Sequence, residues 1–93
     1  MNTYELTIVI REDKEGKEKA RILKVVTDFA KKVKGEVNKQ ESWGAKHLAY
    51  PIKKLDIGEY EHFVLSLPST NQPELEKILH LDEAILRYMF IRV

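Results

Sequence analysis

The chain has 93 residues, of which 43% are hydrophobic and 33% charged, a balance typical of one globular domain with a strongly charged exterior. Its 16 Lys and Arg residues nearly balance its 15 Asp and Glu residues, so the net charge of +1 neither favours nor opposes a polyanionic partner. The lack of cysteine excludes disulfides, zinc–thiolate sites and thiol catalysis, and no apolar run is long enough to span a membrane. We therefore expect a single cytoplasmic domain covering residues 1–93.

The N-terminal part of the chain predicts a strand followed by an amphipathic helix. Residues 4–10 alternate and then become continuously apolar, so we expect a strand with bulk on both faces, at the centre of a sheet. Between residues 17 and 34 the apolar side chains recur at a helical spacing and form one broad stripe. Acidic residues precede this segment and lysines end it, as the helix dipole favours. These lysines are therefore interpreted as a solvated helix face rather than as an RNA-binding patch.

The middle of the chain predicts a long, bent strand and a turn. Residues 36–43 read as a strand that kinks at Gly44 and continues through Leu48–Ile52. Pro51 donates no backbone hydrogen bond, so we expect this strand to lie at an edge of the sheet or to stop pairing there. Residues 54–58 contain Asp and Gly and predict the turn that follows.

The C-terminal part of the chain predicts a strand, a short helix and a final strand. Residues 59–67 alternate and complete a hairpin with the preceding strand. Pro73 belongs to the first turn of a helix of about ten residues. Residues 84–93 form the last strand, and because both of its alternating sets of side chains are bulky, the pattern leaves its two faces unassigned.

This order of elements is that of the ferredoxin-like βαββαβ arrangement, an α+β fold with a four-stranded antiparallel sheet and two helices on one face. Two helices can cover only one side of such a sheet, yet three of the strands carry bulky residues on both faces. At ~25 cal/mol per Å², leaving several such side chains in water forgoes a few kcal/mol of burial, so the uncovered face should contact a partner. The expected partner surface comprises Tyr50, Tyr60, His62, Tyr88 and Phe90.

Several short motifs occur in order along the chain, of which Gly-x-x-x-Leu-Ala-Tyr-Pro-Ile is the most specific: Tyr4–Glu5, Ile8–Ile10, Trp43–Gly44, Leu48–Lys53, Gly58–Tyr60 and Ile85–Met89. In their order and spacing the chain resembles the bacterial small-subunit ribosomal protein six family over essentially its whole length. The resemblance implies a ferredoxin-like fold and a structural, non-catalytic role in the small ribosomal subunit. It also implies binding to the central domain of the small-subunit ribosomal RNA together with small-subunit ribosomal protein eighteen.

RNA contacts of this kind need mobile cations outside the amphipathic helix, because phosphate contacts supply affinity rather than sequence reading. The resemblance favours RNA binding for the basic residues that flank the bent strand or lie on the last strand, and Arg87, inside the Ile85–Met89 motif, is the foremost candidate. The candidate set is Lys46, His47, Lys53, Lys54, Arg87 and Arg92.

Catalysis is not expected. An acylphosphatase-like site on this fold would need a phosphate-cradling loop after the first strand, and the loop at residues 11–16 carries three acids that would repel phosphate. The three histidines, His47, His62 and His80, fall on separate elements without metal-ligand spacing, so neither a metal nor a cofactor is expected. Two alternatives stay open: a free-standing RNA- or protein-binding ferredoxin-like module outside the ribosome, and a homo-oligomer that pairs its own sheet faces.

Overall fold

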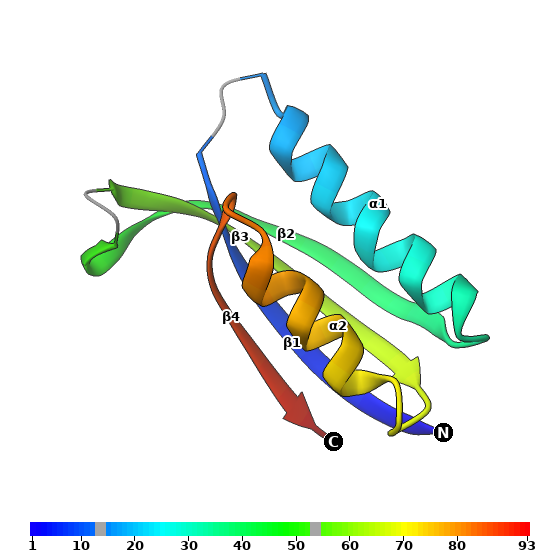
Figure 1. Cartoon of the computed structure of the whole chain (residues 1–93). Coiled ribbons are helices and arrows are strands. Elements are labelled where there is room, and N and C mark those ends of the chain that lie inside the picture. Colours follow the sequence, from blue (N-terminus) through cyan, green and yellow to red (C-terminus); the bar gives the residue numbers. More distant parts are fainter. Residues whose placement is uncertain (13–14, 53–54) are drawn as a thin grey trace.

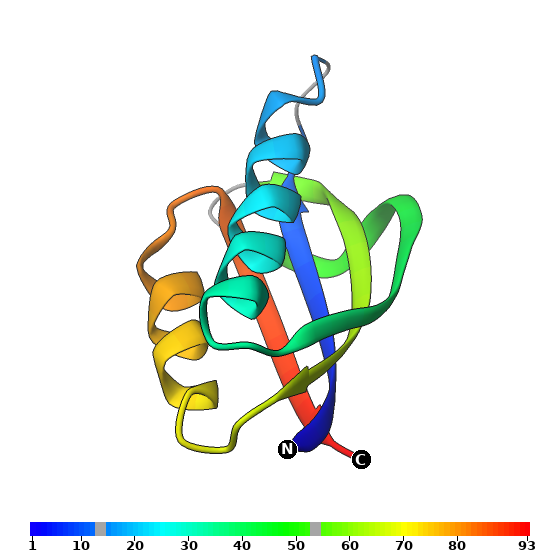
Figure 2. The ribbon, with the colours of Figure 1, turned by 90° about the vertical axis from the view of Figure 1, so that its right-hand side faces the viewer.

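The computed structural model describes residues 1–12, 15–52 and 55–93, with the side chains outside residues 49–56. The observed order of elements confirms the predicted βαββαβ arrangement: β1 (Asn2–Arg11), α1 (Lys17–Lys32), β2 (Glu36–Ile52), β3 (Leu55–Leu67), α2 (Gln72–Leu81) and β4 (Ile85–Arg92). Both helices lie on the same face of the sheet (Figures 1 and 2). Neither α1 nor α2, the helices of the described part of the chain, has the length and apolar character that a membrane-spanning helix requires.

The sheet has four strands in the order β2-β3-β1-β4, and every neighbouring pair is antiparallel. β1 pairs with β3 along its whole length, from Asn2 opposite Leu67 to Arg11 opposite Gly58. The prediction that the first strand is central is therefore confirmed, as is the prediction that the bent strand, β2, lies at an edge.

The core lies between the sheet and the two helices. Alternate residues of β1 and β3 point to this side, where the apolar stripes of α1 and α2 cover them. Each of these large side chains contributes roughly 1.5–3 kcal/mol by leaving water. The fully buried large apolar members are Leu6, Ile8, Ile10, Ile22, Val26, Phe63, Leu65, Leu67, Leu75 and Leu79.

The predicted kink in the bent strand is confirmed. The register between β2 and β3 shifts between Ser42 and Gly44, and Gly44 has φ = +81°, a left-handed conformation that favours glycine. Beyond this bulge the β2–β3 hairpin projects past the rest of the sheet (Figure 1).

The predicted turn at residues 54–58 is wrong in its extent. β3 already begins at Leu55, and Gly58 is a buried strand residue rather than part of a turn. A Cβ atom at Gly58 would clash with Cγ1 of Val9. This glycine is thus required by the close approach of β1, not by a turn. Lys54 lies outside the described residues.

A bidentate ion pair ties α1 to the loop before β4. Nη1 of Arg21 donates to Oδ2 of Asp82 at 2.7 Å, and its Nη2 donates to Oδ1 at 2.9 Å and to Glu18 at 2.8 Å. The Asp82 carboxylate also accepts the backbone N–H of Ala84 at 3.0 Å. The Arg21 hydrogen bonds, and secondarily the Ala84 N–H, hold the pKa of Asp82 below its ordinary value despite its partial burial.

Acidification should remove the contribution of this ion pair to stability. Because the folded pKa of Asp82 lies below the unfolded value of about 3.9, its stabilisation is complete above that value and is lost as the pH falls through the folded pKa. Arg21 is partly exposed, so we expect Asp82→Asn to lower the free energy of unfolding by only about 1 kcal/mol at neutral pH, and by less in strong acid. Urea unfolding of both proteins at the two pH values checks this. An equal loss at both would contradict it.

Glu61 is the one buried charged residue in the described part of the chain, with 1% of its surface exposed. Its carboxylate faces α1, where Nζ of Lys19 lies 3.3 Å away, and it accepts hydrogen bonds from Gln40 at 2.9 Å and Ser42 at 2.7 Å. A buried carboxylate is tolerated only when its oxygens are satisfied in this way. The network links α1, β2 and β3 beside the bulge at Gly44.

Replacing Lys19 with an uncharged residue should destabilise the fold more than replacing Glu61 with an apolar residue. Lys19→Met leaves the buried carboxylate without its cation, and we expect a loss of about 1–2 kcal/mol, reduced by the partial exposure of Lys19. Glu61→Leu fills the same space, and the exposed Gln40 and Ser42 regain water, so a change within ~1 kcal/mol is expected. Urea unfolding measures both variants. A larger loss for Glu61→Leu than for Lys19→Met would refute this account.

Candidate protein and nucleic-acid interface

No described element packs over the face of the sheet opposite the helices. The strand registers and the exposed side chains define a surface here that we call the open face. Three of its apolar side chains remain substantially in water: Trp43 is 42%, Met89 55% and Ile91 48% exposed. Exposed apolar groups on neighbouring strands are typical of a contact surface. The open face consists of Thr7, Val9, Trp43, Lys46, Tyr60, His62, Val64, Arg87, Met89 and Ile91.

A stacked Trp43–His62 pair holds the β2 side of the open face. The two ring centroids are 4.7 Å apart and the planes differ by 10°. Nδ1 of His62 lies 3.0 Å from the Thr7 hydroxyl, and Nε1 of Trp43 donates to Glu41 at 3.0 Å. Each ring is therefore fixed at a second point, so the pair is a preorganised surface.

Glu41 places a negative charge beside this stack. Its other oxygen lies 2.8 Å from Nζ of Lys39. The hydrogen bond from Lys39, followed by that from Trp43, lowers the pKa of the Glu41 carboxyl below its ordinary value. Glu41 therefore stays ionised, and the rim of the exposed tryptophan is charged.

Lys46 lies over two aromatic rings of the open face. Its Nζ is 5.6 Å from the ring centroid of Trp43 and 5.7 Å from that of Tyr60, within cation–π range of both. The bulge at Gly44 sets the orientation of β2 that brings Lys46 over Tyr60 of β3. This predicted RNA-binding residue thus lies on the open face, with its charge still exposed.

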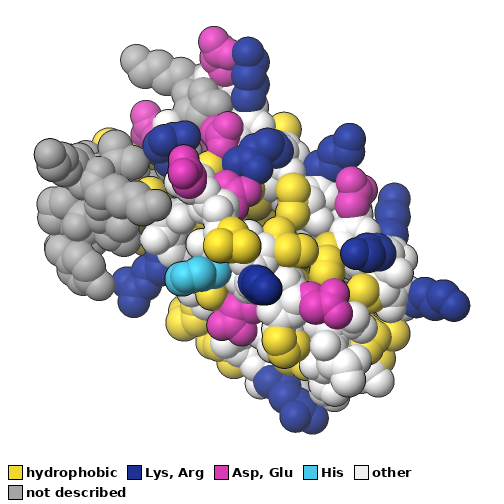
Figure 3. Space-filling view, viewed as in Figure 1, with side chains coloured by type: hydrophobic (Ala, Val, Ile, Leu, Met, Phe, Trp, Pro, Cys, Tyr) yellow, Lys and Arg dark blue, Asp and Glu magenta, His cyan; other side chains and the backbone are white. Residues whose placement is uncertain are grey.

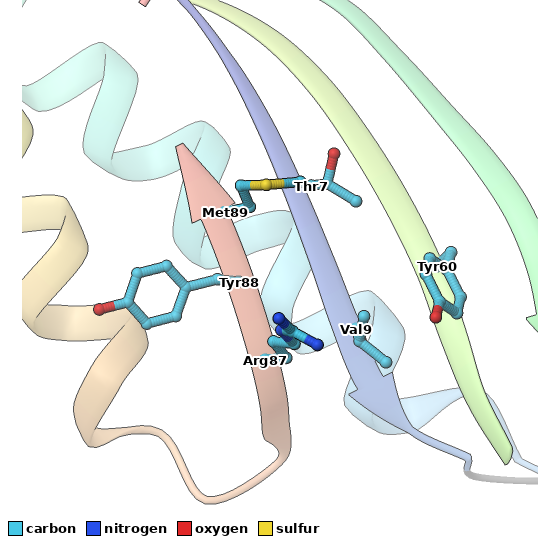
Figure 4. Close-up of a pocket in the computed structure, with 6 residues that line it drawn as sticks. All are labelled: Thr7, Val9, Tyr60, Arg87, Tyr88 and Met89. Carbon is cyan, nitrogen blue, oxygen red and sulfur yellow. The ribbon is translucent and has the colours of Figure 1, made fainter. Parts of the chain in front are cut away.

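A hollow of about 260 Å³ opens between β1, β3 and β4 on the open face. Figure 4 shows Arg87, Val9 and Tyr60 along this hollow, while the ring of Tyr88 reaches out past the free edge of β4. The floor is formed by small side chains of β1, and Arg87 and Tyr60 stand at its sides. The hollow is lined by Thr7, Val9, Tyr60, Arg87, Tyr88 and Met89.

Of the residues predicted to form the protein-partner surface, Tyr60 and His62 lie on the open face, whereas Tyr88 and Phe90 belong to the set of β4 side chains that points to the helix side. Phe90 packs edge-on against Tyr4, with ring centroids 6.0 Å apart, and both Tyr88 and Phe90 pack against the core under the helices. The side chain of Tyr50 lies outside those described. The register with β1 explains the difference.

In that register Met89 lies opposite Thr7 and Ile91 lies opposite Glu5. The side chains of Met89 and Ile91 therefore point to the open face, and those of Tyr88 and Phe90 point to the helix side. Burial and the neighbouring Glu76 carboxylate also raise the pKa of Tyr88, as expected for a phenol turned toward α2. Met89 and Ile91 are the open-face residues that the sequence pattern did not identify.

The predicted RNA-binding cations are not all brought together. Lys46 and Arg87 lie on the open face, whereas strand alternation points His47 to the opposite side of β2. Arg92 also lies on the side opposite Arg87, where its guanidinium donates to Oδ1 of Asn2 at 3.3 Å. The remaining two candidates, Lys53 and Lys54, lie outside the described residues.

The helix side of the molecule carries both signs of charge. Figure 3, viewed from this side, shows Lys and Arg side chains interspersed with Asp and Glu. Mixed charge of this kind is typical of a solvated surface. It supports the interpretation of the α1 lysines as a solvated helix face.

Comparisons with known proteins agree with this architecture. A model of the family "Ribosomal protein S6" matches residues 3–92. The small ribosomal subunit protein bS6 of Pelagibacter ubique is 39% identical over 93 residues, which are 100% of this chain and 77% of that protein. The bS6 protein of Corynebacterium efficiens is 33% identical over 93 residues, covering 100% of this chain and 98% of the relative.

A solved structure shows the same fold. The crystal structure of 30S ribosomal protein S6 from Thermotoga maritima matches with a TM-score of 0.89 and 26% identity, over 99% of this chain and 87% of that one. The sequence matches and the structural match extend along essentially the whole chain. The chain therefore belongs to the ribosomal protein S6 family, whose members are structural, non-enzymatic components of the small ribosomal subunit.

Proposed function

We propose that residues 1–93 act as one cytoplasmic, ribosome-associated domain that binds the central domain of the small-subunit ribosomal RNA together with small-subunit ribosomal protein eighteen. The observation that carries the proposal is the open face, an exposed apolar and aromatic surface with cations at Lys46 and Arg87. Such a surface suits an assembly in which one partner covers apolar side chains and another presents phosphates.

The apolar part of the open face suits a protein partner. Trp43, Tyr60 and Met89 offer large side chains of the kinds enriched at the centres of protein interfaces. The stack with His62 and the hydrogen bond to Glu41 fix the Trp43 ring before binding, so little side-chain entropy is lost on contact.

The free-standing RNA-binding module is less well supported. A sheet that stacks RNA bases needs aromatic side chains on its central strands. On the open face the central strand β1 presents Thr7 and Val9, which offer no ring for stacking. This supports RNA contacts at the cations, through the RNA backbone, and a protein contact at the aromatic surface.

Reversing the charge at Arg87 should weaken incorporation into small subunits by about tenfold, the effect of losing one charge-assisted contact. The Arg87 side chain is exposed, so the free energy of unfolding of Arg87→Glu should stay within ~0.5 kcal/mol of the parent. Sedimentation of tagged chains with small subunits in sucrose gradients, at moderate salt, measures incorporation. The matched control is Lys24→Glu on the exposed side of α1, which makes the same charge change. Equal incorporation of the two variants would remove Arg87 from the RNA contact.

Replacing Met89 with an acidic residue should weaken binding to small-subunit ribosomal protein eighteen. Covering an ionised carboxylate with an apolar partner costs several kcal/mol, so we expect at least about a thirtyfold loss of affinity for Met89→Asp. Leu81→Asp, on the helix side and 69% exposed, is the matched control and should bind like the parent. Titration calorimetry with the purified partner, with and without an rRNA fragment of the central domain, measures the affinities. Unchanged binding of Met89→Asp would show that the partner does not cover this part of the open face.

A further inference from the structure

We propose that the outer edge of β4 accepts an extended strand from another protein of the small subunit, paired through its backbone. The inference deepens the proposed function and rests on it, because it names how a protein partner would join this sheet. β4 ends the strand order β2-β3-β1-β4, so within the described part of the chain only its inner edge is paired, with β1. An unpaired edge presents a row of backbone donors and acceptors to an incoming strand.

The hydrogen bonds to β1 identify which backbone groups face outward. The N–H of Val93 donates to the carbonyl of Thr3 at 2.9 Å, which fixes the alternation along the ladder. Residues 87, 89, 91 and 93 therefore bond inward to β1, and the N–H and C=O groups of Tyr88, Phe90 and Arg92 point away from the sheet.

A hollow borders β4 on each face of the sheet. The hollow of about 260 Å³ lies on the open face, and another of about 310 Å³ lies between β4 and α2, lined by residues such as Leu79 and Leu86. Arg87 and Tyr88 line both. Because side chains of a strand alternate between faces, successive residues of an added strand would lie in turn on the open face, beside Arg87 and Met89, and on the helix side, beside the hollow between β4 and α2.

The two edges of the sheet differ in their protection. β2 has register shifts against β3 on both sides of Gly44 and carries the charged pair Lys39–Glu41, features that discourage strand addition. β4 keeps one register with β1 from Arg92 to Arg87 and has the apolar sequence Met89-Phe90-Ile91 at its middle. β4 is therefore the edge suited to pairing.

Charge determines what kind of strand fits. Residues 85–93 contain Arg87 and Arg92 and no acidic residue. A second copy of β4 would bring two further arginines and no carboxylate to this edge, whereas acidic residues on an added strand could pair with Arg87 on the open face or with Arg92 on the helix side. The edge thus favours an apolar strand with acidic residues, from a different protein, over a second copy of this chain.

Hydrogen exchange of the full chain, free and within purified small subunits, tests the pairing, with the amides read individually after quenching. We expect the outward amides of Tyr88, Phe90 and Arg92 to slow by at least about a hundredfold in the particle. The amides of Met89 and Ile91, bonded to β1, are the internal control and should be slow in both states. Outward amides that exchange at the free rate in a chain bound to the particle would overturn the inference alone. A chain that never enters the particle would overturn the proposed function, and this inference with it.

A cross-link distinguishes a protein strand from RNA lying along the same edge. Val93 is 74% exposed at the end of β4 and is replaced by a photo-reactive benzoylphenylalanine. An adduct that survives ribonuclease and is shortened by protease supports the proposed strand. An adduct to rRNA alone, or to a second copy of this chain, would refute it.

Proline at residue 92 gives an independent test. Arg92→Pro and Arg92→Gln both remove the charge and the side-chain hydrogen bond to Asn2, but only proline removes the outward N–H, and β1 loses no backbone hydrogen bond in either. We expect the proline variant to be incorporated into small subunits about tenfold less well than the glutamine variant, with thermal unfolding of the free chains as the control for folding. Equal incorporation would argue against backbone pairing at this edge.

Discussion

The structure depends on one geometric constraint: two helices cover one face of a four-stranded sheet and leave the other uncovered. β1 shows both consequences, because Leu6 and Ile8 lie in the core while Thr7 and Val9 face the opposite side. The central strand is thus at once the middle of the hydrophobic core and the floor of the contact surface. Any change of its register by one residue would exchange the two sets.

The bend in β2 converts this flat surface into a shaped one. The left-handed Gly44 inserts the bulge that reorients β2, and on either side of it Trp43 stacks on His62 and Lys46 lies over Tyr60. These contacts join β2 to β3 on the open face, while the Glu61 network joins them on the core side. The same bulge therefore shapes the contact surface and sits above a buried polar cluster, which links local backbone conformation to the geometry of the site.

The sequence was sufficient to predict the order of elements, the central first strand, the bent edge strand and the family. It was insufficient where contacts between residues distant in sequence decide which face a side chain occupies or why a residue type is required. The faces of β4 follow from its pairing with β1, in which Thr7 meets Met89, and no periodicity within residues 84–93 contains that information. Gly58 was interpreted as a turn residue because its close contact with Val9 is a long-range feature.

Glu61 was missed as a core residue for the same kind of reason. The alternation of a strand alone does not predict a buried carboxylate among apolar side chains. Only the approach of Lys19 from α1 makes the burial of Glu61 tolerable. Tertiary context overrode the local pattern at each of these positions.

The charges around the open face discourage two free chains from associating through their uncovered apolar surfaces. Glu41 is held ionised beside Trp43, and Lys46 lies over the Trp43 and Tyr60 rings, so the exposed aromatic groups are rimmed by solvated charges of both signs. Charges at a rim cost little when a partner arrives, because they remain in water while the apolar centre is covered. They discourage the pairing of two such faces, since each would have to bury the charges of the other. The open face is therefore suited to contact with a different protein and with phosphate groups rather than with a second copy of this chain.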